Sequence, residues 1–230
     1  MGDGSGADGS GADAAHVVLL HGLARSRASM LVPAWRLQRR GYRVHNLGYP
    51  SRTLSLPELA ERVAARLRQV PAPFHVLTHS MGAIVLRLAA RDAALAARIG
   101  RAVMLAPPNQ GSEWVDLLGP LAPFGWVNGP AGRALATAPG PRVEALPGGL
   151  GPVPFACGVI AGTRPLGPDI RLRGRPLLPA PHDGLVSVAS TRVEGMADHL
   201  SLPVSHTFIM LDAAVLDAAE HFLEHGRFAG

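Results

Sequence analysis

The stretch FHVLTHSMGAIVLRLAA, residues 74–90, decides the fold of this chain. Its first residues, FHVLT, form a short apolar run that predicts a buried strand, and the residues from Met81 onward predict a helix. Ser80 stands at the junction, with Gly82 two positions later. A serine on a sharp, strained turn between strand and helix, with a small neighbour that lets the backbone pass, is typical of an exposed nucleophile. Taken alone, Ser80 equally fits a polar residue that closes a strand.

The same alternation of short apolar runs and amphipathic stretches continues along the chain. It predicts parallel strands joined by crossover helices, and therefore an α/β fold with a mainly parallel sheet and helices on both faces. The expected strands are 16–20, 42–47, 74–78, 101–108, 155–162 and a short one within 199–204. The expected helices are one ending near residue 41, then 56–70, 81–93 and about 212–225.

The length and composition predict one domain with flanking irregular segments. A chain of 230 residues with 47% apolar content can bury one sizeable core, so we expect a single domain over residues 15–230. Residues 1–14 are mostly Gly, Ser, Asp and Ala and predict a flexible tail. The segment 111–154 is rich in Gly and Pro yet carries large apolar side chains. It predicts a cap or lid over a binding site, with an irregular connection packed on the core as the alternative.

Charge and cysteine content exclude several classes of function. The net charge of +5 comes from 22 arginines, without a lysine, against 17 carboxylates. The arginines are scattered and aromatics make up only 5%, which argues against a nucleic-acid partner. Cys157 is the one cysteine, so no intrachain disulfide is possible, and its apolar surroundings predict a buried, inert thiol.

Targeting and cofactor signals are absent from the sequence. No metal-binding or nucleotide-binding motif occurs, so we expect neither a metal nor a cofactor. No apolar run approaches the ~18 residues that a membrane span requires, and no signal peptide is visible. The cytoplasm is the default location, with a secreted mature form as the alternative.

A serine nucleophile needs a base to accept its proton and a carboxylate to orient that base. In the strand-turn-helix architecture these groups follow in the order serine, acid, histidine. Asp183, in HDGLVSV, and His206, in VSHTF, stand in that order and at the carboxyl ends of expected strands. Asp169 and Asp198 are alternative acids, and an Asp-Gly turn is the structural alternative for Asp183.

An acyl transfer also needs donors for the oxyanion that forms on the attacked carbonyl. One donor is expected to be the backbone N–H of Met81, directly after Ser80 and at a helix N-terminus. The other is expected in the loop LLHGLARS, where His21 and Gly22 shape the turn and the Leu23 N–H faces the site.

Six motifs together resemble the α/β-hydrolase family, and within it the small bacterial esterases and lipases. They are HVVLLHGLARS, GYRVHNLGYPSR, THSMG, LAPPNQGSE, HDGLVSV and SHTFIM, and they extend from about residue 16 to the C-terminus apart from most of 115–154. Thr78 stands where the family most often has glycine. The resemblance implies a minimal α/β-hydrolase fold without the usual first two strands. It also implies a triad of Ser80, Asp183 and His206, with the oxyanion hole at Leu23 and Met81.

The resemblance implies a serine hydrolase that cleaves carboxylic esters through an acyl-enzyme intermediate, with a small-molecule or lipid ester as substrate. His79, Pro108, Trp114 and Trp126 are the expected substrate-binding residues, although His79 is also expected to point away from Ser80 and support the turn. Other acyl transfers (thioesterase, amidase or acyltransferase) and a non-catalytic binding protein of the same fold stay open. So do a transient membrane-surface contact through arginines and exposed tryptophan, and the oligomeric state.

Overall fold

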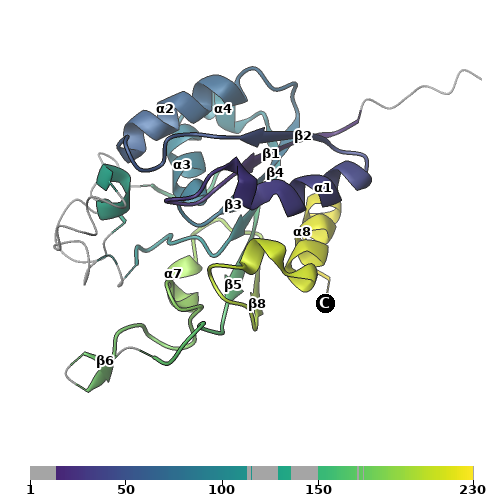
Figure 1. Ribbon diagram of the computed structural model, residues 1–230. Helices are drawn as coiled ribbons and strands as arrows, with labels where there is room; N and C mark the ends of the chain where they lie inside the picture. Colours follow the sequence, from purple (N-terminus) through teal and green to yellow (C-terminus); the bar gives the residue numbers. More distant parts are fainter. Residues whose placement is uncertain are drawn as a thin grey trace, which may run out of the picture.

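The computed structural model describes residues 14–112, 115, 129–135, 150–169, 171–172 and 174–229 (Figure 1). The predicted tail, apart from residue 14, and most of the predicted cap therefore lie outside the described residues. Six strands form one sheet in the order β2-β1-β3-β4-β5-β8, and every neighbouring pair is parallel. The strands are β1 (His16–Leu20), β2 (Arg43–Leu47), β3 (Phe74–His79), β4 (Ile99–Leu105), β5 (Ala156–Gly162) and β8 (Asp198–Leu202).

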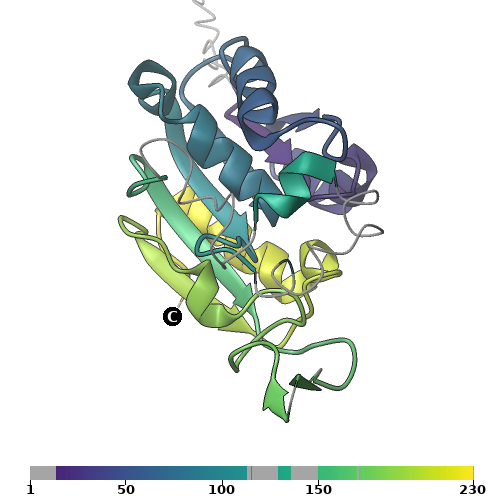
Figure 2. The same ribbon diagram turned by 90° about the vertical axis from the view of Figure 1, so that its left-hand side faces the viewer.

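Helices lie on both faces of this sheet, as the two views in Figures 1 and 2 show. The α-helices are α1 (Leu31–Arg39), α2 (Leu56–Leu67), α3 (Met81–Ala89), α4 (Ala93–Ala96), α7 (Val188–Thr191) and α8 (Ala213–His225). Two 3-10 helices, η1 (Arg27–Met30) and η2 (Ile209–Leu211), adjoin them. The short strands β6 (Arg171–Leu172) and β7 (Arg175–Pro176) pair in a hairpin that projects from the sheet in both views.

The alternation of side chains along each strand divides the core into two clusters. Val18 and Leu20 of β1 pack with α2, α3 and α4, whereas Val17 and Leu19 pack with α1 and α8. Because successive side chains of a strand point to opposite faces, both faces of a parallel sheet must be apolar and covered. The near-continuous apolar runs of the sequence reflect that double burial.

The expected fold class is confirmed, and the element boundaries agree within a few residues. α2 begins with a capping box, in which Ser55 and Glu58 bond each other's backbone. Gly41, after α1, has φ +88, a left-handed conformation that suits the end of a helix. The expected strand over 101–108 instead begins at Ile99 and ends at Leu105, so both prolines follow the strand rather than belonging to it.

Two further sequence expectations concern burial and membranes. Cys157 on β5 is fully buried, and burial raises the pKa of its thiol to about 12, which makes the thiol inert at neutral pH. Among the residues that the structure describes, no helix combines the length and apolarity needed to cross a membrane.

Gly158 on β5 gives the first prediction, because an added Cβ has no room there. It would stand 2.6 Å from Cδ2 of Phe222 and 2.8 Å from Cζ of Phe228, two rings packed with centroids 5.1 Å apart. We expect Gly158→Ala to lower the free energy of unfolding by about 1–3 kcal/mol, the usual cost of overpacking a core. Urea unfolding measures the change.

Gly167→Ala is the matched control, because nothing lies within 4 Å of a Cβ added at that exposed loop position. It should unfold within about 0.5 kcal/mol of the unmodified chain. An unchanged urea midpoint for Gly158→Ala would show that the two phenylalanines do not pack tightly on β5.

Candidate active site

Ser80 lies at the turn between β3 and α3 in a strained conformation. Its backbone has φ 52 and ψ −124, a region that side-chain-bearing residues rarely occupy. The turn is fixed on both sides, since Ser80 N–H donates to Leu105 O at 2.8 Å and Ala83 N–H donates to Ser80 O at 3.0 Å. The surrounding structure therefore holds the side chain of Ser80 at the carboxyl edge of the sheet.

Gly82 makes this turn possible. A Cβ at position 82 would stand 2.7 Å from Leu20 O and 2.9 Å from His21 O, both backbone atoms of β1 or of the loop after it. Only glycine allows α3 to start this close to β1. Thr78, at the place where glycine is commonest in the related family, is fully buried within β3, so its side chain fills the core instead of the site.

Ser80, His206 and Asp183 form one chain of hydrogen bonds. Nε2 of His206 lies 3.0 Å from Oγ of Ser80, and Nδ1 of His206 lies 2.8 Å from Oδ2 of Asp183. All three side chains are buried or nearly so. The structure thus brings Ser80 together with two residues that each lie more than 100 positions later in the sequence, at hydrogen-bond distances.

The carboxylate of Asp183 is oriented by its own loop. Oδ1 accepts the N–H groups of Leu185 and Val186 at 2.9 and 2.8 Å, which leaves Oδ2 for His206. Gly184 follows with φ +101, so the expected Asp-Gly turn exists as well. The two alternatives considered for Asp183 are therefore compatible, because the turn itself presents the acid.

The other candidate acids lie elsewhere. Asp198, the first residue of β8, accepts the backbone N–H of Phe228 at 2.8 Å. Asp169 lies 3.1 Å from Nε2 of His182. His182 is buried, and its Nδ1 accepts the N–H of Gly184 at 3.1 Å. His182 thus supports the loop that carries Asp183.

His79 lies under the site and not at its surface. Its side chain is 2% exposed, and Nε2 lies 3.1 Å from the carbonyl oxygen of His206. Burial and, next, the neighbouring His206 hold the pKa of His79 well below its usual range, so its ring is neutral. The neutral ring must then donate from Nε2, and Nδ1 has no hydrogen-bond partner among the described residues.

The loop after β1 lies directly beside Ser80. A Cβ at Gly22 would stand 3.3 Å from Cβ of Ser80 and 2.9 Å from Nδ1 of His79. His21 anchors the loop, because its ring stacks on Tyr49 with centroids 4.0 Å apart and Nε2 accepts the Tyr49 N–H at 3.3 Å. Burial lowers the pKa of His21, which keeps that acceptor neutral.

The predicted oxyanion donors flank Ser80. Met81 is the first residue of α3, and Leu23 follows Gly22 in the loop that passes the serine. Ala24, next in that loop, has φ 52. Helix starts present unpaired N–H groups, so the backbone at Met81 is suited to an anion.

Sequence reasoning missed several residues that hold the loops together. Gly162 ends β5, where a Cβ would stand 2.7 Å from Cβ of Asp183 and 2.4 Å from Val204 O. Arg87, buried in α3, donates from Nη1 to Asn109 Oδ1 at 2.9 Å, and Asn109 Nδ2 donates to Thr191 O at 2.7 Å. An arginine inside the apolar run AIVLRLAA is a signal that could have indicated such a buried network.

A cavity of about 260 Å³ opens beside His206. Its lining is mainly apolar and includes Leu166, Leu178 and Leu185 as well as Asp183 and Thr207. Pro108 is buried after β4 and is not among the lining residues. Trp114 and Trp126 lie outside the described residues, so their predicted substrate contacts stay predictions.

No metal site is found in the part of the chain that the structure describes, where no three His, Cys, Asp or Glu side chains gather in a suitable group. The arrangement offers a hydroxyl, an imidazole and an oriented carboxylate in series. Chemically, such a series can deprotonate the hydroxyl as it attacks an electrophile.

Several solved structures share this fold. Bacillus licheniformis lipase BlEst2 in its mature form has a TM-score of 0.66 at 19% identity, over 86% of this chain and 87% of that one. Aspergillus fumigatus lipase B has a TM-score of 0.68 at 13% identity, over 92% and 53%. The metagenomic carboxyl esterase MGS0156 has a TM-score of 0.58 at 19% identity, over 86% and 66%. At these identities the likeness establishes the fold alone.

Sequence comparison gives the family. No curated protein sequence matches the chain significantly. The family model described as "Alpha/beta hydrolase family" matches residues 17–224, a range that includes every residue of the hydrogen-bonded series at Ser80. The chain therefore belongs to the α/β-hydrolase family.

Proposed function

We propose that this protein is a serine hydrolase that cleaves carboxylic esters through an acyl-enzyme intermediate. The observation that carries the proposal is the hydrogen-bonded series from Ser80 through His206 to Asp183, held at a strained turn. A serine hydroxyl is a weak nucleophile unless a base takes its proton. The 3.0 Å separation of Oγ from Nε2 meets that requirement without any rearrangement.

The proposed reaction has two halves. Oγ of Ser80 attacks the ester carbonyl carbon while its proton passes to Nε2 of His206, and the carbonyl oxygen becomes an oxyanion. His206 then returns the proton to the leaving alcohol, which departs as the acyl-enzyme forms. In the second half, water attacks the acyl carbon as it loses a proton to His206, and His206 then returns that proton to Oγ of Ser80 as the acid is released.

Asp183 and two backbone groups complete the proposed mechanism. Asp183 bonds Nδ1 of His206, which selects the tautomer whose Nε2 is free to accept the proton and stabilises the imidazolium that follows. The N–H groups of Leu23 and Met81 are proposed as the oxyanion donors. The closeness of the Gly22 loop to Ser80 and the helix start at Met81 support that assignment.

Two observations bear on the substrate. The cavity beside His206 is mainly apolar, which suits a substrate with an apolar part. Lipase and carboxyl esterase are the activities named for three solved structures of the same fold. A cap formed by part of 111–154 stays a prediction.

His79 is proposed as a positioning residue. Its bond to the carbonyl oxygen of His206 fixes the backbone that carries the catalytic imidazole. Its neutral ring adds no positive charge next to the imidazolium that His206 becomes during turnover. A charged side chain at this position would oppose proton transfer to His206.

Labelling of Ser80 is the first test of the proposed chemistry. We expect a fluorophosphonate probe to modify Ser80, as located by peptide mapping, and Ser80→Ala to lower kcat for p-nitrophenyl esters by roughly 10⁴-fold or more. A series of acyl chains from short to long then reports the size of the acyl pocket. Ser201→Ala, an exposed serine of β8, should keep full activity and labelling. A label on another residue, with active Ser80→Ala, would refute the assignment.

Replacement of His79 tests the positioning role. His79→Leu removes the donor to His206 O, and we expect kcat for the same esters to fall roughly 10- to 100-fold with little change in KM, because displaced catalytic groups slow chemistry more than binding. His79→Gln, which can still donate, should recover much of kcat. Equal kcat values for His79→Leu and His79→Gln would mean that the hydrogen bond from residue 79 to the carbonyl oxygen of His206 does not position His206.

Acid sensitivity follows from the lowered pKa of His79. Its pKa is below 6.5 in the folded state and near 6.5 in the unfolded chain, so the unfolded chain binds more protons as pH falls below about 6.5. This group therefore makes the folded state less stable in acid, at a slope of at most about 1.4 kcal/mol per pH unit.

Urea unfolding of Ser80→Ala and of Ser80→Ala/His79→Gln at pH 7.5 and 5.5 measures this effect. The second protein should lose less free energy of unfolding on acidification, because glutamine does not titrate. Identical losses in the two proteins would contradict a neutral, buried His79.

A further inference from the structure

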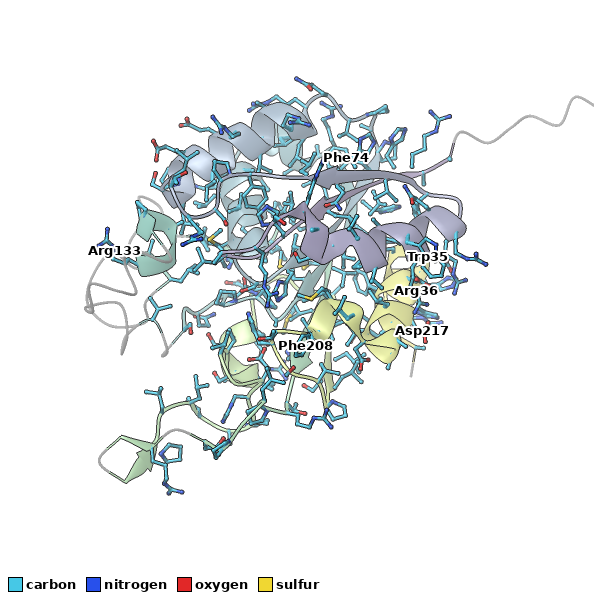
Figure 3. All side chains as sticks on the ribbon, viewed as in Figure 1. Trp35, Arg36, Phe74, Arg133, Phe208 and Asp217 are labelled. Atoms are coloured by element: carbon cyan, nitrogen blue, oxygen red, sulfur yellow. The ribbon has the colours of Figure 1, made fainter. Side chains whose placement is uncertain are left out.

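Five large apolar side chains are exposed on two neighbouring elements, α1 and η2 with its capping residue. We call them the α1–η2 face. They are Leu31, Val32, Trp35, Phe208 and Leu211, with exposed fractions from 41% to 59%. α1 and η2 are in contact, and Figure 3 shows Trp35 on α1 and Phe208 at η2. Large exposed apolar side chains concentrated on one part of a surface indicate an interaction site.

The helix geometry explains why these side chains face outward. Positions 31, 32 and 35 lie on one side of α1, whereas Ala34 and Leu37 lie on the other and are buried in the core beneath β1. The rest of the structure does not need the outer side chains, since the inner side already covers the sheet. Packing of the core therefore does not explain why positions 31, 32 and 35 of α1 carry large apolar side chains.

The segment that includes α1 is rich in arginine. Between residues 14 and 57 the chain has seven arginines, at 25, 27, 36, 39, 40, 43 and 52, and no carboxylate. Arg36 pairs with Asp217 and Glu220 of α8, and Arg40 pairs with Glu220; Arg36 and Asp217 are labelled in Figure 3. Within the described residues, no carboxylate lies in ion-pair distance of the exposed Arg25, Arg27 or Arg39.

Arg39 and Trp35 together show the chemistry of the face. The guanidinium of Arg39 lies 5.1 Å above the centroid of the Trp35 ring. Tryptophan and arginine side by side, with leucine, valine and phenylalanine around them, are the combination that lies in the headgroup region of a bilayer. The apolar groups enter the acyl boundary, and the cations remain with the anionic headgroups.

Charge also distinguishes lipid from a second copy of this chain. A symmetric dimer through this face would bring the arginine-rich surface of one copy against the same surface of the other. Like charges brought together at an interface oppose association, whereas an anionic surface attracts them. The charge complementarity therefore favours an anionic lipid surface as the occupant.

The α1–η2 face adjoins the candidate active site. Phe208 follows His206 by two residues, and Nη2 of Arg25 donates to the carbonyl oxygen of Thr207 at 3.4 Å. Arg25 also belongs to the loop that carries Leu23. Anything that docks on this face would therefore lie next to the two loops that border Ser80, which carry Leu23 and His206.

We propose that the α1–η2 face docks the protein on anionic lipid surfaces. Leu31, Val32, Trp35, Phe208 and Leu211 enter the interface, and Arg25, Arg27 and Arg39 pair with the headgroups. This inference goes beyond the proposed function and does not depend on it, since docking requires no reaction at Ser80.

Vesicle co-sedimentation of the full chain tests the charge part of the proposal. Ser80→Ala serves as the background, so that no lipid is hydrolysed. We expect binding to vesicles of phosphatidylcholine with phosphatidylglycerol, weak binding to phosphatidylcholine alone, and weaker binding as salt rises. Arg27→Gln with Arg39→Gln should lower the partition coefficient about thirtyfold, since each basic side chain at such a surface contributes about fivefold. Arg62→Gln with Arg66→Gln, on α2 at the opposite side of the sheet, is the matched control and should change it at most a few-fold.

A second pair of substitutions tests the apolar part. Trp35→Ser with Phe208→Ser should lower the partition coefficient at least tenfold. Thermal unfolding verifies that each variant is folded. Unchanged binding in either set of face variants, or no binding to the anionic vesicles, would overturn the proposal. So would sedimentation showing a dimer that Trp35→Ser with Phe208→Ser dissociates, because a second copy would then cover the face.

Discussion

At Gly82 the first turn of α3 passes so close to β1 that one added carbon would stand 2.7 Å from the carbonyl oxygen of Leu20. That contact sets where the helix begins, and the helix start sets the backbone conformation of Ser80. With φ 52, the side chain of Ser80 is directed out of the sheet edge instead of continuing the alternation of β3. His206 and Asp183 can activate a nucleophile only because this turn presents the hydroxyl of Ser80 to His206.

Strain and close approach gather at the same edge of the sheet. Ala24, Ser80 and Ala106, the three residues other than glycine with positive φ in the described part of the chain, follow β1, β3 and β4. Gly162 ends β5 against Val204 and Asp183. Away from this edge, the central strands β1, β3, β4 and β5 are packed on both faces by the two core clusters. A rigid two-sided core thus supports unfavourable local conformations at one edge, which is where strained backbone is usually found in functional proteins.

The sheet, its covering helices and the turn at Ser80 could be predicted from the sequence because each has a local cause, whereas Asp183 and His206 were predicted from their order along the chain and from the resemblance to a family. Apolar alternation reflects burial, and Ser80 and Gly82 carry the geometry of one turn. Gly162 and Asn109 could not be predicted in the same way, since their roles depend on which loops meet in space. The cap over 111–154 remains a prediction from composition.

The loop that carries Asp183 orients its own carboxylate. Because Leu185 and Val186 bind one oxygen of the carboxylate, the orientation of the acid is encoded within four consecutive residues. The rest of the protein anchors that loop, in part through Ser112, which donates to Leu185 O at 2.7 Å. The loop therefore orients its carboxylate through its own backbone. Changes in the length or composition of the neighbouring segments can alter which substrates reach Ser80 while the direction of the carboxylate stays the same.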